Sequence, residues 1–374
     1  MFKRYFIISL ALMIAQLSVA STSVEKINVF VSGQEGYHTY RIPAIIRAQN
    51  HDLLAFAEGR KLGGGDAGDI DLLLKKSSDG GRTWNAQKIL WNDGANTCGN
   101  PCPVLDASTG TLWLLATHNP GGVNEKEIID RARTGSRTVW ILKSTDHGSS
   151  WSSPVEITAL TKKSNWTWYA TGPGIGIQIQ NGPHAGRLVI PCDYNDQDPT
   201  NPKKSRRGSH VIFSDDHGQT WQIGGTLSPG LNECQVAELF DGQGTLVINM
   251  RSYLGRATRA QSRSEDGGLS WSTVVDAPAL IEPVCQASLL RHDDAHLLLF
   301  SNPAHTTQRV NLTLRTSSDN AQTWNNLAVI HAGPAAYSSL VALDAATVGC
   351  LYENGEKKPY ERITFARLPL NWSP

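Results

Sequence analysis

Five stretches of the chain share one eight-residue pattern: SSDGGRTW (Ser77–Trp84), STDHGSSW (Ser144–Trp151), SDDHGQTW (Ser214–Trp221), SEDGGLSW (Ser264–Trp271) and SSDNAQTW (Ser317–Trp324). The copies recur at intervals of roughly 50 to 70 residues, which is the length of a small β-sheet and not of a helix pair. Such a period indicates sheets arranged radially. We therefore predict an all-β fold, a six-bladed β-propeller of four-stranded antiparallel blades.

The octapeptide has the chemistry of a tight turn. Its third residue is Asp, whose carboxylate can accept N–H bonds within the turn, and the Gly two positions later tolerates positive φ. The closing Trp is expected to pack against the sheet. We interpret the motif as a structural hairpin turn between outer strands, away from any central pocket. The last copy has Ala321 in place of Gly, so its turn is expected to be strained or differently shaped.

The first twenty residues are typical of a bacterial secretory signal peptide. Lys3 and Arg4 precede an apolar run from Tyr5 to Val19, and Ser18–Ala20 offers small residues for cleavage. A retained anchor is the alternative. We expect residues 1–20 to be removed, residues 21–374 to form one propeller domain, and the protein to be secreted or periplasmic. A blade closed by strands from both chain ends would explain five motif copies in six blades.

Charge and cysteine content exclude several classes of function. The 374-residue chain has 34 basic and 34 acidic side chains, so nothing indicates a nucleic-acid-binding stripe or a polybasic membrane surface. Six Cys in an exported chain allow disulfides, and Cys98 and Cys102 could bridge, but they lack a second ligand pair at zinc spacing. No phosphate-binding Gly-rich loop, HExxH or Ser/His/Asp signature occurs.

Between the motif copies, short apolar runs alternate with Gly, Pro and Asn turns, as in β-strands. The clearest runs are Asp52–Ala57, Thr111–Thr117, Arg187–Pro191, Thr245–Met250 and His296–Ser301. Helical periodicity is confined to Asn124–Arg133, which could equally be a polar loop. Asp193–Arg207 is rich in Asn, Asp, Pro, Lys and Arg, and we expect a long irregular segment at the functional face.

A second pattern lies near the N-terminal end of the predicted domain. Tyr40-Arg41-Ile42-Pro43 is followed by a predicted strand, by Phe56–Arg60 and then by Asp66 in a Gly-rich stretch. The Arg-Ile-Pro tripeptide combined with the repeated octapeptide resembles the exo-α-sialidase (neuraminidase) family of six-bladed propellers. The resemblance covers nearly all of the chain beyond residue 20.

The resemblance implies a clamp of three arginines on the carboxylate of sialic acid. By motif these are Arg41, Arg251 in Ile248–Arg251, and Arg309 in His305–Arg309. Arginine suits a carboxylate ligand in any protein, because the planar guanidinium donates paired, charge-assisted hydrogen bonds to a carboxylate.

Tyr337 resembles the nucleophile of this family, an exception among glycosidases. The anomeric carbon of sialic acid already carries a carboxylate, which would repel an anionic carboxylate nucleophile. A neutral phenol avoids this repulsion if a base removes its proton. Glu233 resembles that base, and Glu238 is the rival in the same stretch.

Asp66 resembles the residue that protonates the departing oxygen and later activates water. For this role its pKa must be raised by burial under substrate or by a nearby carboxylate. Asp69 and Asp71 are competitors, although their alternation suggests the polar face of a strand.

Supporting residues follow from the same resemblance. Arg60, with Glu58 nearby, resembles the pair around the 4-hydroxyl of the sugar, and Glu353 resembles the carboxylate that fixes Arg41. Contacts to the glycerol and N-acyl groups are expected from Tyr194, Asp193 and Glu125.

These assignments predict a retaining exo-α-sialidase that acts on sialylated glycoproteins, glycolipids or oligosaccharides. The resemblance implies no cofactor and no catalytic metal. We expect no nucleic-acid partner and no membrane insertion after signal cleavage. The alternatives are a non-catalytic glycan-binding propeller and a variant chemistry: a trans-sialidase, an intramolecular trans-sialidase or a hydrolase for a related nonulosonic acid.

Overall fold

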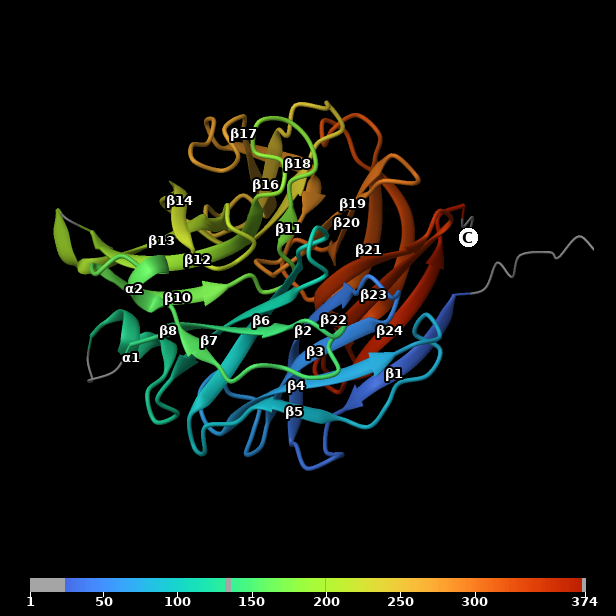
Figure 1. The fold of residues 1–374 in the computed structure, drawn as a ribbon. Helices are drawn as coiled ribbons and strands as arrows, with labels where there is room; N and C mark the ends of the chain where they lie inside the picture. Colours follow the sequence, from blue (N-terminus) through green and yellow to red (C-terminus); the bar gives the residue numbers. More distant parts are fainter. Residues whose placement is uncertain (1–23, 132–135, 199, 372–374) are drawn as a thin grey trace, which may run out of the picture.

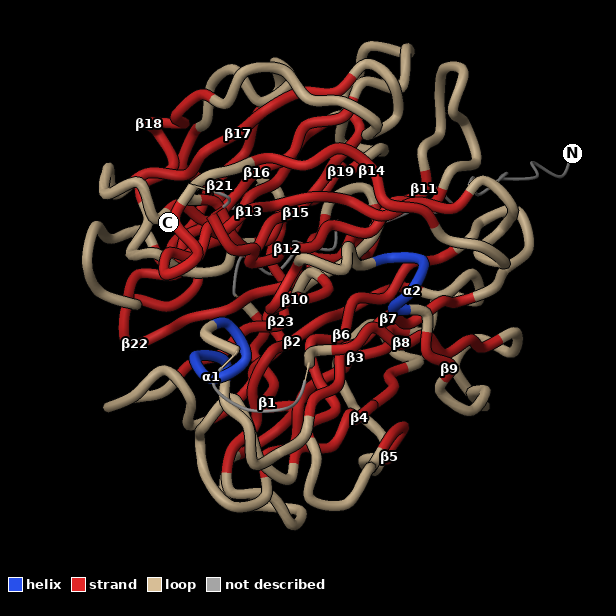
Figure 2. Tube along the Cα trace, turned by 90° about the vertical axis from the view of Figure 1, so that its left-hand side faces the viewer, coloured by secondary structure: helices blue, strands red, loops and turns tan. Residues whose placement is uncertain are grey.

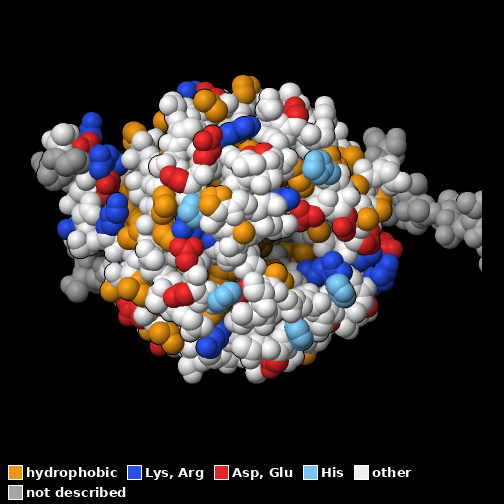
Figure 3. All heavy atoms as spheres, turned by 45° about the horizontal axis from the view of Figure 1, so that its top comes forward, with side chains coloured by type: hydrophobic (Ala, Val, Ile, Leu, Met, Phe, Trp, Pro, Cys, Tyr) orange, Lys and Arg blue, Asp and Glu red, His pale blue; other side chains and the backbone are white. Residues whose placement is uncertain are grey.

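The computed structural model describes residues 24–131, 136–198 and 200–371, so the predicted signal peptide lies outside the described residues. Strands make up most of the fold, and the predicted all-β class is confirmed. The sheets curl around a common centre (Figures 1 and 2). Figure 3 shows Lys, Arg, Asp and Glu side chains interspersed over one face, in line with the balanced formal charge.

The described strands form four hydrogen-bonded sheets. The first contains β2 (Thr39–Arg47), β3 (Leu53–Arg60), β4 (Ile70–Ser77), β5 (Lys88–Trp91), β6 (Thr97–Leu105), β7 (Leu112–Asn119), β8 (Thr138–Ser144) and β9 (Val155–Glu156). The second contains β10 (Trp166–Thr171), β11 (Ile177–Gln178), β12 (Leu188–Asp198), β13 (Asn201–Ser214) and β14 (Gln222–Leu227).

The third sheet contains β15 (Leu231–Glu238), β16 (Leu246–Ser252), β17 (Thr258–Ser264) and β18 (Val275–Ile281). The fourth contains β1 (Glu25–Val31), β19 (Ser288–His292), β20 (Leu297–Pro303), β21 (Val310–Ser317), β22 (Asn325–Asp344), β23 (Thr347–Asn354) and β24 (Arg362–Pro369). In this sheet β1 pairs antiparallel with β24, so the first and last described strands close the ring together.

The five apolar runs predicted as strands fall in β3, β7, β12, β16 and β20. Within the ambiguous segment Asn124–Arg133, helix α1 (Glu125–Ile129) begins at a capping box in which Asn124 and Glu127 exchange hydrogen bonds. Helix α2 (Thr158–Thr161) had no sequence signal. Neither helix, nor any other among the described residues, is long and apolar enough to cross a membrane.

The prediction of an irregular segment at Asp193–Arg207 was wrong. Residues 193–198 and 201–207 belong to the outer parts of β12 and β13, which pair in antiparallel register from Leu188↔Ser214 outward. Cross-strand ion pairing stabilises it, since the Arg206 guanidinium donates to Asp196 Oδ1 at 3.0 Å and Oδ2 at 2.6 Å. The polar composition hid the strands because this segment lacks the apolar alternation by which a strand is recognised.

Each octapeptide forms the predicted turn and begins at the last residue of β4, β8, β13, β17 or β21. In the first copy, Asp79 Oδ1 accepts hydrogen bonds from the backbone N–H groups of Arg82 and Thr83, both at 2.9 Å, and Gly81 has φ of 89°. The turn also packs against a strand from another part of the chain. The Trp84 ring meets Phe365 of β24 edge-on at 5.5 Å.

The fifth copy is strained but not differently shaped. Ala321 has φ of 63°, a left-handed conformation that is unfavourable for a residue with a Cβ atom. The turn nevertheless keeps its hydrogen bonds: Ala321 N–H donates to Ser317 Oγ at 3.0 Å, and Thr323 N–H to Asp319 Oδ1 at 2.9 Å.

Cys98 and Cys102, which the sequence allowed to bridge, form no disulfide, and all six cysteines are free and buried. The two side chains belong to different hydrophobic clusters. Cys98 packs with Phe56 and Leu114, whereas Cys102 packs with Val104 and Ile190. A register shift in β6 between Gly99 and Cys102 contributes to this separation.

We predict that Gly81→Ala lowers the free energy of unfolding by about 2 kcal/mol or more. A Cβ atom here would lie 2.1 Å from the Phe365 ring, in addition to the cost of positive φ. The matched control is Gly33→Ala, where φ is 83° but no atom lies within 4 Å, and we expect a loss of about 1 kcal/mol. Urea unfolding measures both, and equal losses would contradict a packing role for this turn.

Candidate active site

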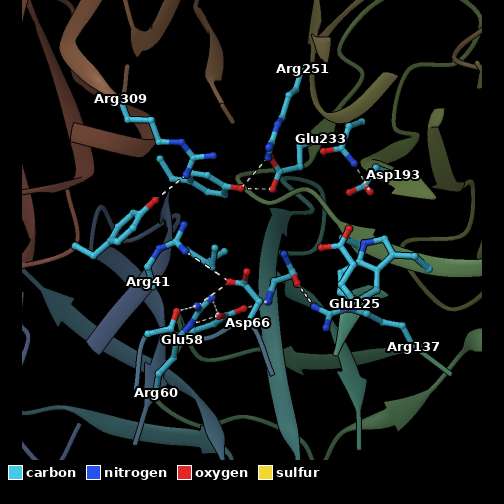
Figure 4. A pocket seen from close by; sticks show the side chains of 18 of the residues that line it. Arg41, Glu58, Arg60, Asp66, Glu125, Arg137, Asp193, Glu233, Arg251 and Arg309 are labelled. Carbon is cyan, nitrogen blue, oxygen red and sulfur yellow. Dashed lines mark hydrogen bonds and ion pairs between the residues drawn. The ribbon is translucent and has the colours of Figure 1, made fainter. Parts of the chain in front are cut away.

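A cavity of about 340 Å³ opens among the inner strands. It collects most of the residues that the sequence singled out, and its lining includes Arg41, Arg60, Asp66, Glu125, Asp193, Glu233, Arg251, Arg309 and Tyr337. Figure 4 shows Arg41, Arg251 and Arg309 pointing toward one another on one side, with Glu125 and Asp193 on the other.

Glu353 lies behind the cavity wall and is fully buried. Its Oε1 accepts hydrogen bonds from Arg41 Nε at 2.7 Å and from the Ile42 N–H at 2.9 Å, while its Oε2 accepts from the Tyr337 N–H at 3.1 Å. Ile42 has φ of 58°, rare for a β-branched residue, where β2 shifts register. One carboxylate thus fixes both Arg41 and the backbone of Tyr337.

The three predicted clamp arginines differ in their partners. Arg41 is paired with Glu353, and Arg251 Nη1 contacts Glu233 Oε2 at 2.6 Å. Arg309 Nη1 donates to Tyr360 Oη at 2.7 Å, and among the described residues Arg309 has no carboxylate partner. The cluster therefore has more positive charge than the protein neutralises at this wall, which suits an anionic ligand.

Tyr337 and Glu233 form a direct pair: Tyr337 Oη donates to Glu233 Oε1 at 2.6 Å. Arg251 Nη1 donates to the same phenolic oxygen at 3.2 Å. Burial and the Glu233 carboxylate raise the pKa of Tyr337 well above its usual value, and the nearby arginines oppose this shift. The arrangement is a nucleophile in contact with a base.

The rival base Glu238 lies elsewhere. It ends β15 and caps a loop, with its carboxylate accepting from the N–H groups of Gln180 at 2.6 Å and Asn181 at 3.1 Å. It does not line the cavity. Glu233, the residue that the resemblance favours, lines the cavity, and Glu238 does not.

Asp66 lies on the loop between β3 and β4, and its side chain is 66% exposed. Its Oδ1 contacts Arg60 Nη1 at 2.7 Å and Arg41 Nη1 at 3.6 Å. Partial burial acts to raise the pKa of Asp66, but the two guanidinium groups outweigh it and hold the pKa below its usual value. The upward shift of the pKa that a general acid needs is therefore not supplied by the protein groups around Asp66.

The competitors Asp69 and Asp71 do not line the cavity. Both contact Lys61 Nζ, at 2.8 and 3.2 Å, and Asp71 is fully buried and accepts from Tyr37 Oη at 2.6 Å. The interpretation of Asp71 as part of a polar strand face was wrong, because this side chain is an internal hydrogen-bond acceptor.

Arg60 is held in place by Glu58. Arg60 Nη2 contacts Glu58 Oε2 at 2.7 Å, and both side chains are buried. The other oxygen of Glu58 accepts from the Asn100 N–H at 2.9 Å. Asn100 has φ of 52°, so the backbone is in an unusual conformation where it meets the cavity.

The opposite wall contains Asp193, which is buried. Its Oδ2 accepts from Asn232 Nδ2 at 2.8 Å, whereas Oδ1 has no hydrogen-bond partner among the described residues. Burial, followed by the charges of Glu233 and Glu125, raises the pKa of Asp193 well above its usual value. This side chain is therefore a candidate neutral donor in the cavity.

Tyr194, predicted to contact ligand, is not part of this wall. Adjacent residues of a strand point to opposite faces, so when Asp193 faces the cavity Tyr194 faces away. Its ring stacks on Trp166 at 4.1 Å inside a hydrophobic cluster. The prediction of a cavity position for Tyr194 was wrong.

Several lining residues escaped the sequence analysis: Asn100, Arg137, Trp168, Asn232, Tyr253 and Tyr360. Arg137 is buried, lies 4.2 Å from the centre of the Trp168 ring and donates to Asn119 and Asn100. Arg137 precedes an ordinary strand and Trp168 lies within one, so only the three-dimensional fold brings them together.

Comparisons with known proteins identify the family to which the chain belongs. A model of the BNR repeat-like domain matches residues 51–350. Sialidase-2 of Cricetulus griseus is 31% identical over 368 residues, which cover 90% of this chain and 94% of that protein. The chain belongs to the sialidase family.

The other sialidase relatives support the same placement. The sialidase of Micromonospora viridifaciens is 33% identical over 354 residues, but the match covers only 53% of its length against 90% of this chain. Among solved structures, Hadza microbial sialidase Hz136 superposes with a TM-score of 0.80 at 31% identity, covering 92% of this chain and 68% of that one. The leech intramolecular trans-sialidase, at 18% identity and a TM-score of 0.77, shares the fold.

We predict that Asp193→Asn raises the thermal unfolding midpoint at pH 7 by about 2 °C or more and has less effect at pH 4. The folded pKa of Asp193 exceeds the unfolded one, so ionisation costs stability as the pH rises above about 4, and Asn removes this cost. Asp196→Asn is the control, since it breaks the ion pair with Arg206 and should not stabilise. Equal gains at both pH values would contradict the assignment.

Proposed function

We propose that this protein is a retaining exo-α-sialidase that hydrolyses terminal α-ketosidically linked sialic acids. One observation carries the proposal: Tyr337 Oη contacts Glu233 at 2.6 Å beside a cluster of three arginines. A phenol in contact with a carboxylate base adds nothing evident to the stability of a polar cavity. The same pair suits nucleophilic attack on a carbon that bears a carboxylate. The sialidase relatives support the same activity.

Binding begins with the substrate carboxylate at Arg41, Arg251 and Arg309. Each charge-assisted hydrogen bond contributes about 1.5–3 kcal/mol. Arg309 offers the least neutralised guanidinium, and the Glu353 carboxylate keeps Arg41 in a fixed orientation. Arg60, fixed by Glu58, is proposed to bind the 4-hydroxyl of the sugar. Asp193 and Glu125 on the far wall are proposed to contact the glycerol or N-acyl groups.

In the first chemical step, Tyr337 Oη attacks the anomeric carbon and its proton passes to Glu233. The bond from that carbon to the leaving oxygen breaks, and this oxygen takes a proton from Asp66. In the second step, water gives a proton to Asp66 and attacks the same carbon. The bond to Tyr337 breaks, and Glu233 returns the proton to the phenolate. Two inversions leave the α configuration retained.

Asp66 must carry a proton for the first step, although Arg60 and Arg41 lower its pKa in the unliganded site. We infer that substrate reverses this effect. The bound carboxylate neutralises Arg41 and adds a negative charge beside Asp66, while the sugar excludes water. The general acid therefore becomes competent only when the clamp is filled.

We also infer that the four sheets divide into six four-stranded blades. The first sheet joins β2–β5 to β6–β9 only through the parallel pair Ile70↔Thr97. The long β22 pairs with β21 through its first half and with β23 through its second. We further propose that residues 21–374 form one domain that is exported after cleavage at residue 20, with sialylated glycoproteins, glycolipids or oligosaccharides as substrates.

Transfer chemistry is the alternative reaction, and intramolecular trans-sialidases from leech and from Ruminococcus gnavus share the fold. Their identity to this chain is only 18% and 19%, so they carry no argument on its reaction. The mass of the product separates free sialic acid from its anhydro form or from transfer to a second sugar. A non-catalytic glycan-binding propeller would need neither Tyr337 nor Glu233.

We predict that wild-type protein releases sialic acid from an aryl α-sialoside and that Tyr337→Phe abolishes most of this turnover, because the nucleophilic oxygen is lost. NMR of the first-formed anomer tests retention. Tyr194→Phe is the matched control, since Tyr194 lies outside the cavity. Near-normal turnover by a folded Tyr337→Phe variant would rule out the nucleophile assignment.

We predict that Arg309→Ala weakens binding of a 2,3-dehydrated sialic acid analogue by roughly 2–3 kcal/mol, since one charged donor pair is removed. Isothermal titration measures the affinity directly. Arg256→Ala removes an exposed arginine that pairs with Asp276 and serves as control. Unchanged affinity in Arg309→Ala would remove this residue from the clamp.

A further inference from the structure

The loop that carries Asp66 connects β3 to β4, and its base holds a cluster of ion pairs that the proposed mechanism does not use. Lys61, the first residue of the loop, contacts Asp69 Oδ1 at 2.8 Å and Asp71 Oδ2 at 3.2 Å. We propose that this bridge makes Lys61 a positioning residue for the general acid, because it holds the loop where Asp66 can reach the leaving oxygen. The inference rests on the proposed function and adds a residue to its machinery.

The outer part of this loop has few contacts of its own to fix its conformation. Gly63, Gly64 and Gly65 precede Asp66, and glycine places the weakest restraint on the backbone of any residue. Leu62, the one large apolar side chain in this stretch, is 87% exposed and does not anchor the loop. The position of Asp66 therefore depends on polar contacts at the tip and at the base of the loop.

The polar contacts at the tip are made by arginines that the substrate also needs. Asp66 Oδ1 lies 2.7 Å from Arg60 Nη1 and 3.6 Å from Arg41 Nη1 (Figure 4). Arg60 Nη1 also donates to the Gly64 carbonyl at 2.7 Å. In the proposed complex the substrate carboxylate binds Arg41 and the 4-hydroxyl binds Arg60, so the substrate competes with Asp66 for both donors. The tip is thus held least firmly at the moment when the acid must act.

The contacts at the base involve no group that the proposed mechanism assigns to the substrate. The Lys61 N–H donates to the Asp69 carbonyl at 3.1 Å. The Gly68 N–H donates to Thr97 Oγ1 at 3.1 Å, and this hydroxyl donates back to the Gly68 carbonyl at 3.0 Å. The Lys61 ammonium adds a side-chain link between the first and last residues of the loop, so substrate binding leaves the base closed.

Asp71 attaches this link to a fixed point of the sheet, because its side chain is fully buried in β4. Its Oδ2 accepts from Tyr37 Oη at 2.6 Å, and its Oδ1 accepts from Asn92 Nδ2. A buried carboxylate needs its positive partner, so the Lys61 side chain is held tightly. Burial acts to lower the pKa of Lys61, but the carboxylates of Asp69 and Asp71 outweigh it and raise the pKa, which keeps the ammonium charged.

The experiment measures how strongly turnover depends on protonation of the leaving group. It compares Lys61→Met with the wild type on two aryl α-sialosides. A nitrophenyl sialoside releases an acidic phenol that needs little help from a general acid, whereas a phenyl sialoside needs more. We expect Lys61→Met to lower the ratio of kcat/KM for the phenyl substrate to kcat/KM for the nitrophenyl substrate roughly tenfold. Using a ratio cancels general losses of folded enzyme.

Two further variants separate positioning from general support of the fold. Lys75→Met is the matched control, since Lys75 is a buried lysine of β4 that pairs with Glu35 at 2.5 Å and does not line the cavity. We expect its ratio to equal that of the wild type. Lys61→Arg keeps a cation that can bridge two carboxylates, and we expect it to restore most of the ratio. The 2,3-dehydrated analogue should bind every variant as it binds the wild type, because the arginine clamp is intact.

An unchanged ratio in folded Lys61→Met would overturn the inference while leaving the proposed hydrolysis intact. An equal fall of the ratio in Lys75→Met, or weaker binding of the analogue to Lys61→Met, would also overturn it, because the effect would then be one of general stability. The absence of recovery in Lys61→Arg would contradict the bridging role. Failure of the wild type on every sialoside would contradict the proposed function, and the inference would fall with it.

Discussion

The buried carboxylate of Glu353 is the contact on which the candidate site depends. It bonds to Arg41 and to the backbone of Ile42 and Tyr337, and so joins β2, β22 and β23, which lie at opposite ends of the sequence. A buried carboxylate without partners would cost several kcal/mol, so the chain must bring all three donors to it in the folded state. The same bonds hold Ile42 in a left-handed conformation that an isolated strand would leave. The contacts that join β2 to β22 and β23 therefore also position Arg41 and Tyr337.

The ion pairs that Glu353 and Glu233 form leave the charge in the cavity unevenly neutralised. Glu353 and Glu233 satisfy one face of Arg41 and of Arg251, and Arg309 is left with a phenol and a carbonyl as partners. On the far wall Asp193 is buried without full hydrogen bonding. Both features cost stability in the unliganded protein, and both would be relieved by a ligand with an anionic group at one end and polar groups at the other.

The sequence predicted those structural features and site residues whose determinants are local or belong to a recognisable motif. The octapeptide specifies its turn through bonds within eight residues, so even Ala321 adopts the left-handed conformation that the other copies assign to Gly. The arginines and Tyr337 were found because their neighbours resemble those of a known family. Arg137 and Trp168 could not be found, since the first precedes an ordinary strand, the second lies within one, and only the fold brings the two side chains together. Tyr194 could have been excluded once the strand through Asp193 was recognised, because alternate faces follow from strand geometry alone.

Glu233 and Glu238 show how strongly the surroundings of a carboxylate decide its role. They lie five residues apart on β15, and only the family resemblance favoured Glu233 in the sequence, yet their surroundings in the fold differ completely. Glu238 is bound to backbone N–H groups of a loop, whereas Glu233 meets a phenol and a guanidinium. The role of a carboxylate is set by the donors around it and not by its own chemistry. In the candidate site, the groups that the architecture leaves incompletely satisfied are Arg309, which has no carboxylate partner among the described residues, and Asp193, whose Oδ1 accepts no hydrogen bond from them.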